Sequence, residues 1–195
     1  LVLNPWNIDA LKKKKKETGK RINTILQLRL HPSIIELKKK VESEPKEKVH
    51  DINLTYITSR GKWYQISWKG DIKKSGGVAT NIGVHFFDML LWIFGDVKKN
   101  IVTMSNYNKV SGHLKLEKAN VNWMLSLDEE DLPKNVLRNG QKTFRSITIG
   151  GKEIEFSGGF TDLHTISYQE ILNGKGFGLK DVRKSIELVH YIRNS

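Results

Sequence analysis

The sequence contains no cysteine and only 4 prolines among its 195 residues. Without a thiol the chain forms no disulfide, carries out no thiolate catalysis and offers no sulfur ligand to zinc or to an iron–sulfur cluster. The longest uninterrupted apolar run, residues 89–94, is far too short to cross a membrane. These absences predict a globular protein, and its length predicts a single main core.

Several motifs are also missing. The sequence has no P-loop and no nucleophile elbow around a serine. Residues 174–178 are rich in glycine, but they lack the dinucleotide-binding spacing and follow an expected helix rather than a strand. No signal-peptide pattern opens the chain, and it begins with Leu1 instead of Met, which predicts that the natural protein starts further upstream.

Acidic residues are scarce relative to basic ones, because 33 Lys and Arg against 21 Asp and Glu give a formal net charge of +12. Such an excess raises the hypothesis of a nucleic-acid-binding domain. The densest basic stretch is residues 12–16, which are consecutive lysines on an expected helix. A lysine run of this kind is more typical of a solvated helix face than of a binding arm.

Hydrophobic periodicity predicts helices alternating with strands. Short turns between consecutive strands predict an α+β fold, with an antiparallel or mixed sheet covered by helices on one face. Gly150 and Gly151 are expected to form a two-residue hairpin turn. The expected helices are 5–18, one that starts at Pro32, 80–94, 162–174 and 180–193, and the expected strands are 21–30, 49–59, 98–109, 116–127, 142–149 and 152–157.

The expected helix 80–94 is apolar on most sides and carries one polar stripe. Asn81, His85 and Asp88 fall within roughly 60° of one another on a helical wheel. Because an unpartnered buried polar group is costly, three of them on one stripe indicate a lined cavity. The alternative is a core histidine that is hydrogen-bonded to Asp88, with Thr80 or Asn81 as the N-cap. His85 and Asp88, joined by His164, could be proposed as a metal site, but this spacing is common by chance and the sequence does not mark a third ligand, so we predict no metal.

The connection 60–75 interleaves aromatic and basic residues just before this helix. Aromatic rings stack on bases or sugars, and Arg and Lys bind phosphate or carboxylate. The alternative is an edge strand whose aromatic side chains pack on another subunit. Proximity to His85 in the sequence favours a shared anionic ligand.

Residues 75–95, with Gly76-Gly77, Asn81, His85 and Asp88, resemble the C-terminal domain of the Gfo/Idh/MocA oxidoreductases. This chain has Asn81 where that family usually has Asp. The match to one branch of that family, the bacterial UDP-N-acetylglucosaminuronic acid 3-dehydrogenases, extends further. Three segments look like those enzymes: residues 60–64, residues 67–71 and Asp162-Leu163-His164-Thr165. The resemblance covers essentially the whole chain.

The resemblance implies a mostly antiparallel open-faced sheet, with helices on one face, over residues 1–195. Residues 1–19 would be the connecting helix that follows a dinucleotide-binding Rossmann domain, which is absent from this chain together with a catalytic lysine. The chain would then be the substrate-binding and catalytic half of an NAD- or NADP-dependent sugar dehydrogenase, inactive alone. The intact enzyme would oxidise C3 of a UDP-N-acetylglucosaminuronate in surface-polysaccharide synthesis in the cytoplasm.

The resemblance and the residue types together give a set of candidate residues. His85 is the expected base or proton relay, and Gln27 is expected to approach the nicotinamide. The expected substrate-binding residues are Asn81, Arg60, Trp63, Ser67, Lys69, Ser75 and Arg29. The family also implies a homodimer or homotetramer formed through the sheet, with neither a nucleic acid nor a membrane as a partner. A non-catalytic oligomerisation module remains the main alternative.

Overall fold

A six-stranded sheet is the centre of the computed structural model, which describes residues 2–154 and 162–195. Its strand order is β3-β4-β5-β2-β6-β7, and every neighbouring pair is antiparallel except β2 and β5. The sheet is mostly antiparallel, as expected. The strands are β2 (His50–Thr58), β3 (Val97–Ser105), β4 (Lys109–Leu116), β5 (Ala119–Ser126), β6 (Thr143–Ile149) and β7 (Lys152–Glu153).

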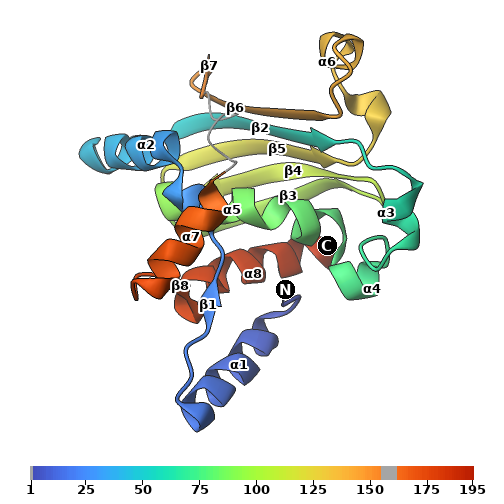
Figure 1. Cartoon of the computed structure of the whole chain (residues 1–195). Helices are drawn as coiled ribbons and strands as arrows, with labels where there is room; N and C mark the ends of the chain where they lie inside the picture. Colours follow the sequence, from blue (N-terminus) through green and yellow to red (C-terminus); the bar gives the residue numbers. More distant parts are fainter. Residues whose placement is uncertain (1, 155–161) are drawn as a thin grey trace.

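Helices cover one face of this sheet. The helices α5 (Val84–Phe94) and α8 (Leu179–Arg193) pack on each other, and in Figure 1 α5 lies in front of β3 while α8 lies below it. Helix α5 is apolar except for His85 and Asp88, and its Phe87 and Leu90 are fully buried. Helix α8 is amphipathic and buries residues such as Val189 and Ile192. The other helices are α1 (Pro5–Thr18), α2 (Pro32–Ser43), α3 (Lys62–Ile66), α4 (Ile72–Ser75), α6 (Lys134–Arg138) and α7 (Leu163–Leu172).

The opposite face of the sheet is polar and largely uncovered. Strand β2 alternates as predicted, with Ile52 and Leu54 buried against the helices and Asp51 and Asn53 exposed on the other face. Side chains there form a hydrogen-bonded row across four strands. The row joins His113, Asn122, Asn53 and Thr148.

The expected turn between β6 and β7 is confirmed. Gly150 and Gly151 have φ values of +56° and +79°, and two consecutive positive φ values are what a two-residue hairpin turn of type I′ requires. Glycine adopts this conformation without steric cost. Of the expected strand 152–157, the structure shows β7 at its start, and residues 155–157 lie outside the described residues.

Two other expectations are wrong. The expected strand 21–30 contains only β1 (Asn23–Thr24), which pairs with β8 (Phe177–Gly178), and then the 3₁₀ turn η1 (Gln27–Leu30). Its apolar side chains are buried without a long strand, since a short apolar run does not by itself distinguish strand from other buried structure. Residues 98–127 hold three strands instead of the two expected there, because β4 ends at a turn after Leu116.

The segment Ile72–Phe94 is helical for most of its length and is apolar enough to span a membrane by composition alone. However, 78% of its most apolar window is buried inside the molecule. It is therefore a core helix, and a membrane is not indicated.

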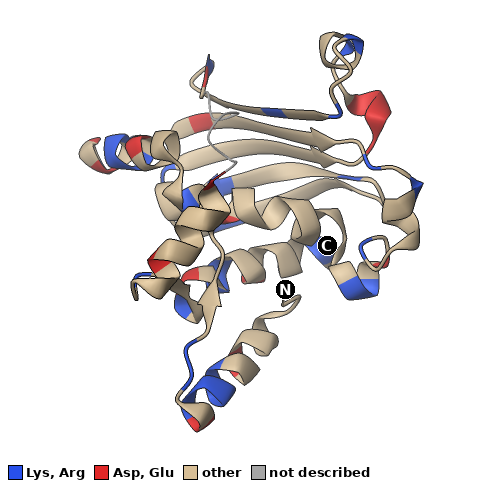
Figure 2. Ribbon diagram, viewed as in Figure 1, with Lys and Arg blue, Asp and Glu red and all other residues tan. Residues whose placement is uncertain are grey.

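Positive charge is spread over the surface instead of forming one stripe. Figure 2 shows Lys and Arg on α1, α2, α4 and several loops, with acidic residues between them. The lysines at 12–16 are all exposed on α1, which is consistent with a solvated helix face.

Candidate active site

A π-helical turn precedes α5 and carries the first residue of the polar stripe. Gly76 and Gly77 have φ values of +76° and +73°, so they end α4 and redirect the chain. The turn η2 (Ala79–Gly83) follows and continues into α5 without a break. Thr80 and Asn81 lie within the helical segment, so the expectation that one of them is its N-cap is wrong. Single π turns inside helices occur often at functional sites.

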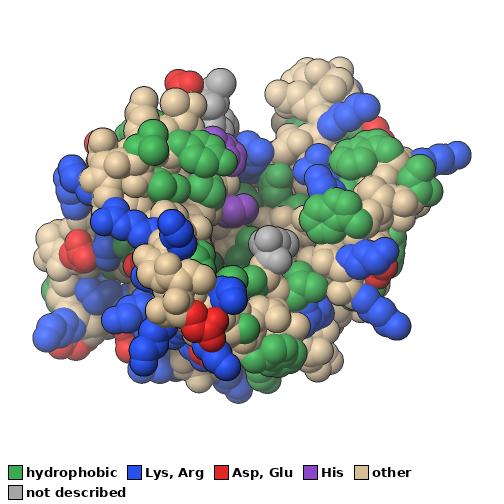
Figure 3. Space-filling view, turned by 60° about the horizontal axis from the view of Figure 1, so that its bottom comes forward, with side chains coloured by type: hydrophobic (Ala, Val, Ile, Leu, Met, Phe, Trp, Pro, Cys, Tyr) green, Lys and Arg blue, Asp and Glu red, His purple; other side chains and the backbone are tan. Residues whose placement is uncertain are grey.

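His85 lies at the wall of a cavity. The cavity has a volume of about 350 Å³, and His85 is half-buried beside it. In the space-filling view, histidine side chains border a hollow at the centre of this face (Figure 3). The other lining residues are mostly apolar and come from α1, β1, α8 and the chain between them: Val2, Leu11, Ile22, Asn23, Thr24, Ile25, Leu26, Val84, Leu179, Val182 and Ile186.

Burial controls the protonation of this imidazole. It lowers the pKa of His85, the nearby carboxylate of Asp88 opposes this shift, and His164 on α7 lowers the pKa further. Because the usual pKa of histidine is about 6.5, the ring is neutral at pH 7 and one nitrogen has a free lone pair. A neutral imidazole at a cavity wall can accept a proton from a bound hydroxyl group.

Asp88 pairs with Arg29 and does not orient His85. Both carboxylate oxygens accept hydrogen bonds of 2.8 Å from the Arg29 guanidinium, and Ser185 Oγ donates a third at 2.7 Å. The Arg29 guanidinium also donates to the Asp181 carbonyl and lies 5.7 Å and 5.3 Å from the ring centres of Trp92 and Phe177. Asp88 is 1% exposed and Arg29 9% exposed.

This ion pair ties η1, α5 and α8 together. Its contacts give the Arg29 guanidinium a structural role, and the predicted contact of Arg29 with a substrate carboxylate stays a prediction. The sequence pattern alone could not reveal the ion pair between Arg29 and Asp88, because the two residues are 59 positions apart in the chain.

Asn81 is held by a residue that the sequence did not mark. Its Nδ2 donates a 2.6 Å hydrogen bond to the hydroxyl of Tyr64, which lies on α3 and is 4% exposed. Burial raises the pKa of Tyr64, and the Asn81 bond and the charge of Arg60 reduce that shift.

The connection 60–75 folds into α3 and α4, so the edge-strand alternative is wrong. Arg60 is exposed and lines a second small cavity of about 170 Å³ together with Tyr64 and Glu129. Trp63 is 52% exposed, and the Lys69 ammonium lies 5.6 Å from its ring centre. Arg60 and Lys69 therefore offer accessible positive charge near Tyr64, and Trp63 offers an accessible ring.

The two predicted serines have local structural roles. Ser67 Oγ donates to the Tyr64 carbonyl and accepts from the Lys69 amide, which closes the turn after α3. Ser75 is fully buried and its hydroxyl accepts from the Gly77 amide. Their hydroxyls shape the backbone that carries Lys69 and η2, so the structure does not place them as direct substrate contacts.

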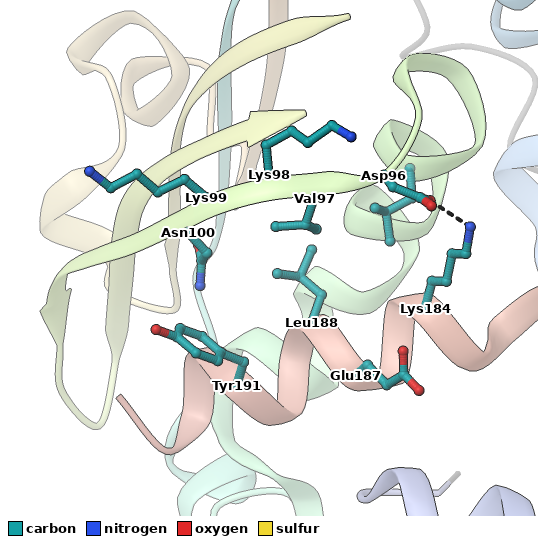
Figure 4. A pocket seen from close by; sticks show the side chains of 10 residues that line it. Asp96, Val97, Lys98, Lys99, Asn100, Lys184, Glu187, Leu188 and Tyr191 are labelled. Atoms are coloured by element: carbon teal, nitrogen blue, oxygen red, sulfur yellow. Dashed lines mark hydrogen bonds and ion pairs between the residues drawn. The ribbon is translucent and has the colours of Figure 1, made fainter. Parts of the chain in front are cut away.

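A larger groove lies elsewhere, between β3 and α8. Its volume is about 650 Å³, and none of the predicted site residues lines it. Figure 4 shows Tyr191 and Leu188 of α8 facing Val97 and Asn100 of β3, with Lys184 paired to Asp96 at one end. Of the predicted site residues, His85 lines the smaller cavity described above.

The described residues include an unpartnered buried amide oxygen on Gln27 and no candidate metal cluster. No group of three His, Asp or Glu residues in the described ranges could hold a metal ion. Gln27 Oε1 on η1, by contrast, is buried and has no hydrogen-bond partner within the described structure. An unpartnered buried amide oxygen suits an incoming N–H donor, such as the carboxamide of a nicotinamide ring.

Comparison with known proteins gives the family. Residues 38–132 match the family described as "Oxidoreductase family, C-terminal alpha/beta domain", of the Gfo/Idh/MocA type. The WlbA (WbpB) dehydrogenase from Thermus thermophilus, solved in complex with NAD and α-ketoglutarate, is 47% identical over 99% of this chain with a TM-score of 0.92. The chain therefore carries a Gfo/Idh/MocA C-terminal domain at residues 38–132. It spans only 62% of that dehydrogenase chain and corresponds to its C-terminal part.

Other solved relatives agree with this assignment. A second structure of the Thermus thermophilus dehydrogenase, in complex with NAD and UDP-GlcNAcA, is 46% identical over 99% of this chain and 62% of its own, again with a TM-score of 0.92. The WlbA dehydrogenase from Bordetella pertussis is 17% identical over 100% of this chain and 66% of its own, with a TM-score of 0.76, and so shows the shared fold alone.

Proposed function

We propose that this Gfo/Idh/MocA domain is the substrate-binding and catalytic half of an NAD(P)-dependent dehydrogenase that oxidises C3 of a UDP-N-acetylglucosaminuronate. The observation that carries the proposal is the half-buried, neutral His85 at the wall of a cavity. The similar dehydrogenase from Thermus thermophilus was solved with NAD and UDP-GlcNAcA, which supports this substrate class. On this proposal residues 1–19 connect the domain to a separate dinucleotide-binding domain.

His85 is the proposed proton acceptor. As the sugar hydroxyl becomes a carbonyl, its proton moves to the free imidazole nitrogen, a role that His85 shares with a lysine of the dinucleotide-binding domain. Asn81 precedes His85 by about one helical turn and orients a sugar hydroxyl. Asp88 remains paired with Arg29, so that its negative charge stabilises the imidazolium without receiving the proton.

Gln27 is the proposed contact to the cofactor. When it is bound, a nicotinamide cofactor accepts the hydride that leaves the sugar carbon. Gln27 Oε1 accepts from the carboxamide and so gains the partner that it lacks among the described residues. Because Gln27 shares η1 with Arg29, the buried ion pair to Asp88 also fixes Gln27 relative to His85.

Arg60, Trp63 and Lys69 are the proposed contacts to the diphosphate, the uracil and the uronate. The cations of the exposed Arg60 and the partly buried Lys69 attract the anionic groups, and the Trp63 indole offers a stacking surface. We place the enzyme in the cytoplasm, in agreement with its lack of cysteine.

Thermal unfolding of this chain tests ligand recognition. A UDP-N-acetylglucosaminuronate at 100 times its dissociation constant should stabilise the folded chain by about 2.7 kcal/mol, which raises the Tm by several degrees. UDP-N-acetylglucosamine, which lacks the carboxylate, should raise it less. No response to either would favour the non-catalytic module, and a response only to single-stranded nucleic acid, lost steeply with salt, would favour the nucleic-acid alternative.

Turnover by the full-length enzyme tests the reaction. It should reduce NAD with the UDP-uronate, and deuterium placed at C3 of the sugar should appear in the reduced cofactor. Deuterium retained in the sugar would contradict oxidation at C3.

We also propose that the chain forms a homodimer or homotetramer through the uncovered face of the sheet. The polar row from His113 to Thr148 supports this proposal, because these side chains are already ordered by mutual hydrogen bonds and lose little entropy on association. Light scattering should give the mass of a dimer or tetramer, and Asn122→Arg at the centre of the row should shift it towards the monomer. A wild-type monomer at micromolar concentration would contradict the proposal.

A further inference from the structure

Tyr64 connects two groups of residues that the proposed function treats separately. Through its hydroxyl it contacts Asn81, which lies four residues before His85. Its side chain also lines the small cavity that contains Arg60. Tyr64 lies on the short helix α3, and its backbone carbonyl accepts a hydrogen bond from Ser67 Oγ. The backbone of Tyr64 is therefore held in place as well as its hydroxyl.

The hydrogen bond determines how Asn81 presents its amide. Asparagine offers a carbonyl oxygen at one end and an NH₂ group at the other, and an unconstrained amide can exchange the two. In the structure the NH₂ end donates to the Tyr64 oxygen at 2.6 Å, so that Oδ1 is the end left for a ligand. A carbonyl oxygen in this place accepts a hydrogen bond from a sugar hydroxyl.

Tyr64 is well suited to hold this arrangement. Its ring is 4% exposed and its phenol stays protonated, so it neither moves freely nor introduces a second charge next to His85. The hydroxyl accepts the Asn81 bond through its oxygen.

We propose that Tyr64 is a positioning residue for the dehydrogenase reaction, which holds the Asn81 amide with Oδ1 directed to the sugar. The inference deepens the proposed function and rests on it. It assigns to Tyr64 a role that depends on Asn81, and it therefore predicts that the effects of changing the two residues are not additive.

A double-mutant cycle in the full-length enzyme tests this dependence. Tyr64→Phe keeps the ring but removes the hydrogen-bond acceptor, and we expect kcat/KM for the UDP-uronate to fall about 10-fold. In an Asn81→Ala background the same change should cost less than about 2-fold, because no amide remains to be held. Tyr56→Phe is the matched control, since Tyr56 is also a buried tyrosine, at 8% exposure, and packs on Phe86 instead of Asn81.

The outcomes separate the inference from the proposed function. If Tyr64→Phe costs the same factor in the wild-type and in the Asn81→Ala background, Tyr64 acts through general packing and the inference is overturned, although the function stands. Unchanged kcat/KM in Tyr64→Phe would overturn it as well. If the wild-type enzyme does not turn over the UDP-uronate at all, the proposed function fails and the inference falls with it.

Discussion

Replacing Arg29 with Met is expected to lower the free energy of unfolding of this chain by about 3–5 kcal/mol. The substitution leaves the Asp88 carboxylate, 1% exposed, in the core without its bidentate partner. For a chain of this length the loss corresponds to a Tm lower by about 10 °C. Urea denaturation followed by circular dichroism measures it.

Two further variants make this test specific. Arg183→Met removes the exposed pairs with Asp9 and Glu187 and should cost only a small part of that loss, because water screens exposed pairs. Arg29→Met combined with Asp88→Leu should recover part of the stability, since no charge is then left buried without a partner. If the two changes simply add, the buried pair does not stabilise the fold in the way described.

His85→Gln is expected to reduce kcat of the full-length enzyme by about 10²- to 10⁴-fold, which is the usual contribution of a positioned general base. Glutamine retains hydrogen-bonding capacity but accepts no proton near neutral pH. His190→Gln is the matched control, because His190 joins α8 to Asn4 near the start of α1 and lies outside the His85 cavity. Initial rates of NADH formation give the comparison, and a His85→Gln enzyme with nearly normal kcat would show that the histidine is structural.

The pH dependence of the stability of His85→Gln, compared with that of the wild-type chain, tests the lowered pKa of His85. Burial lowers the pKa of His85 in the folded chain below the usual 6.5, so the unfolded chain binds more protons between these two values. The wild-type chain should therefore lose stability as the pH falls through this window, and His85→Gln should lose less. An identical loss in both chains would contradict the pKa shift.

The elements that depend on local pattern could be predicted from the sequence. The apolar helix that includes α5, the alternation of β2 and the turn at Gly150 and Gly151 follow from hydrophobic period and glycine conformation alone. The segment around η1 could not be predicted, because the apolar side chains among residues 25–30 are there for burial and not for strand pairing.

The site shows the same limit. His85 and Asn81 could be found because one helix carries both of them. The partner of Asp88 could not, since Arg29 reaches it only through the tertiary fold, and the sequence suggested His85 instead. Tyr64 does not stand out in the sequence, because its neighbours Trp63 and Arg60 account for the same aromatic and basic pattern. A tyrosine between a predicted cationic group and a predicted polar stripe is the signal that could have found it.

The pH dependence of kcat/KM for the UDP-uronate, in the full-length wild-type enzyme and in His85→Gln, tests the proposed role of His85 most directly. In the wild type the rate should fall on the acid side with an apparent pKa below 6.5, as His85 gains a proton and can no longer accept one. The residual rate of His85→Gln should lack this acid limb. The same acid limb in both enzymes would show that another group accepts the proton and would contradict the account.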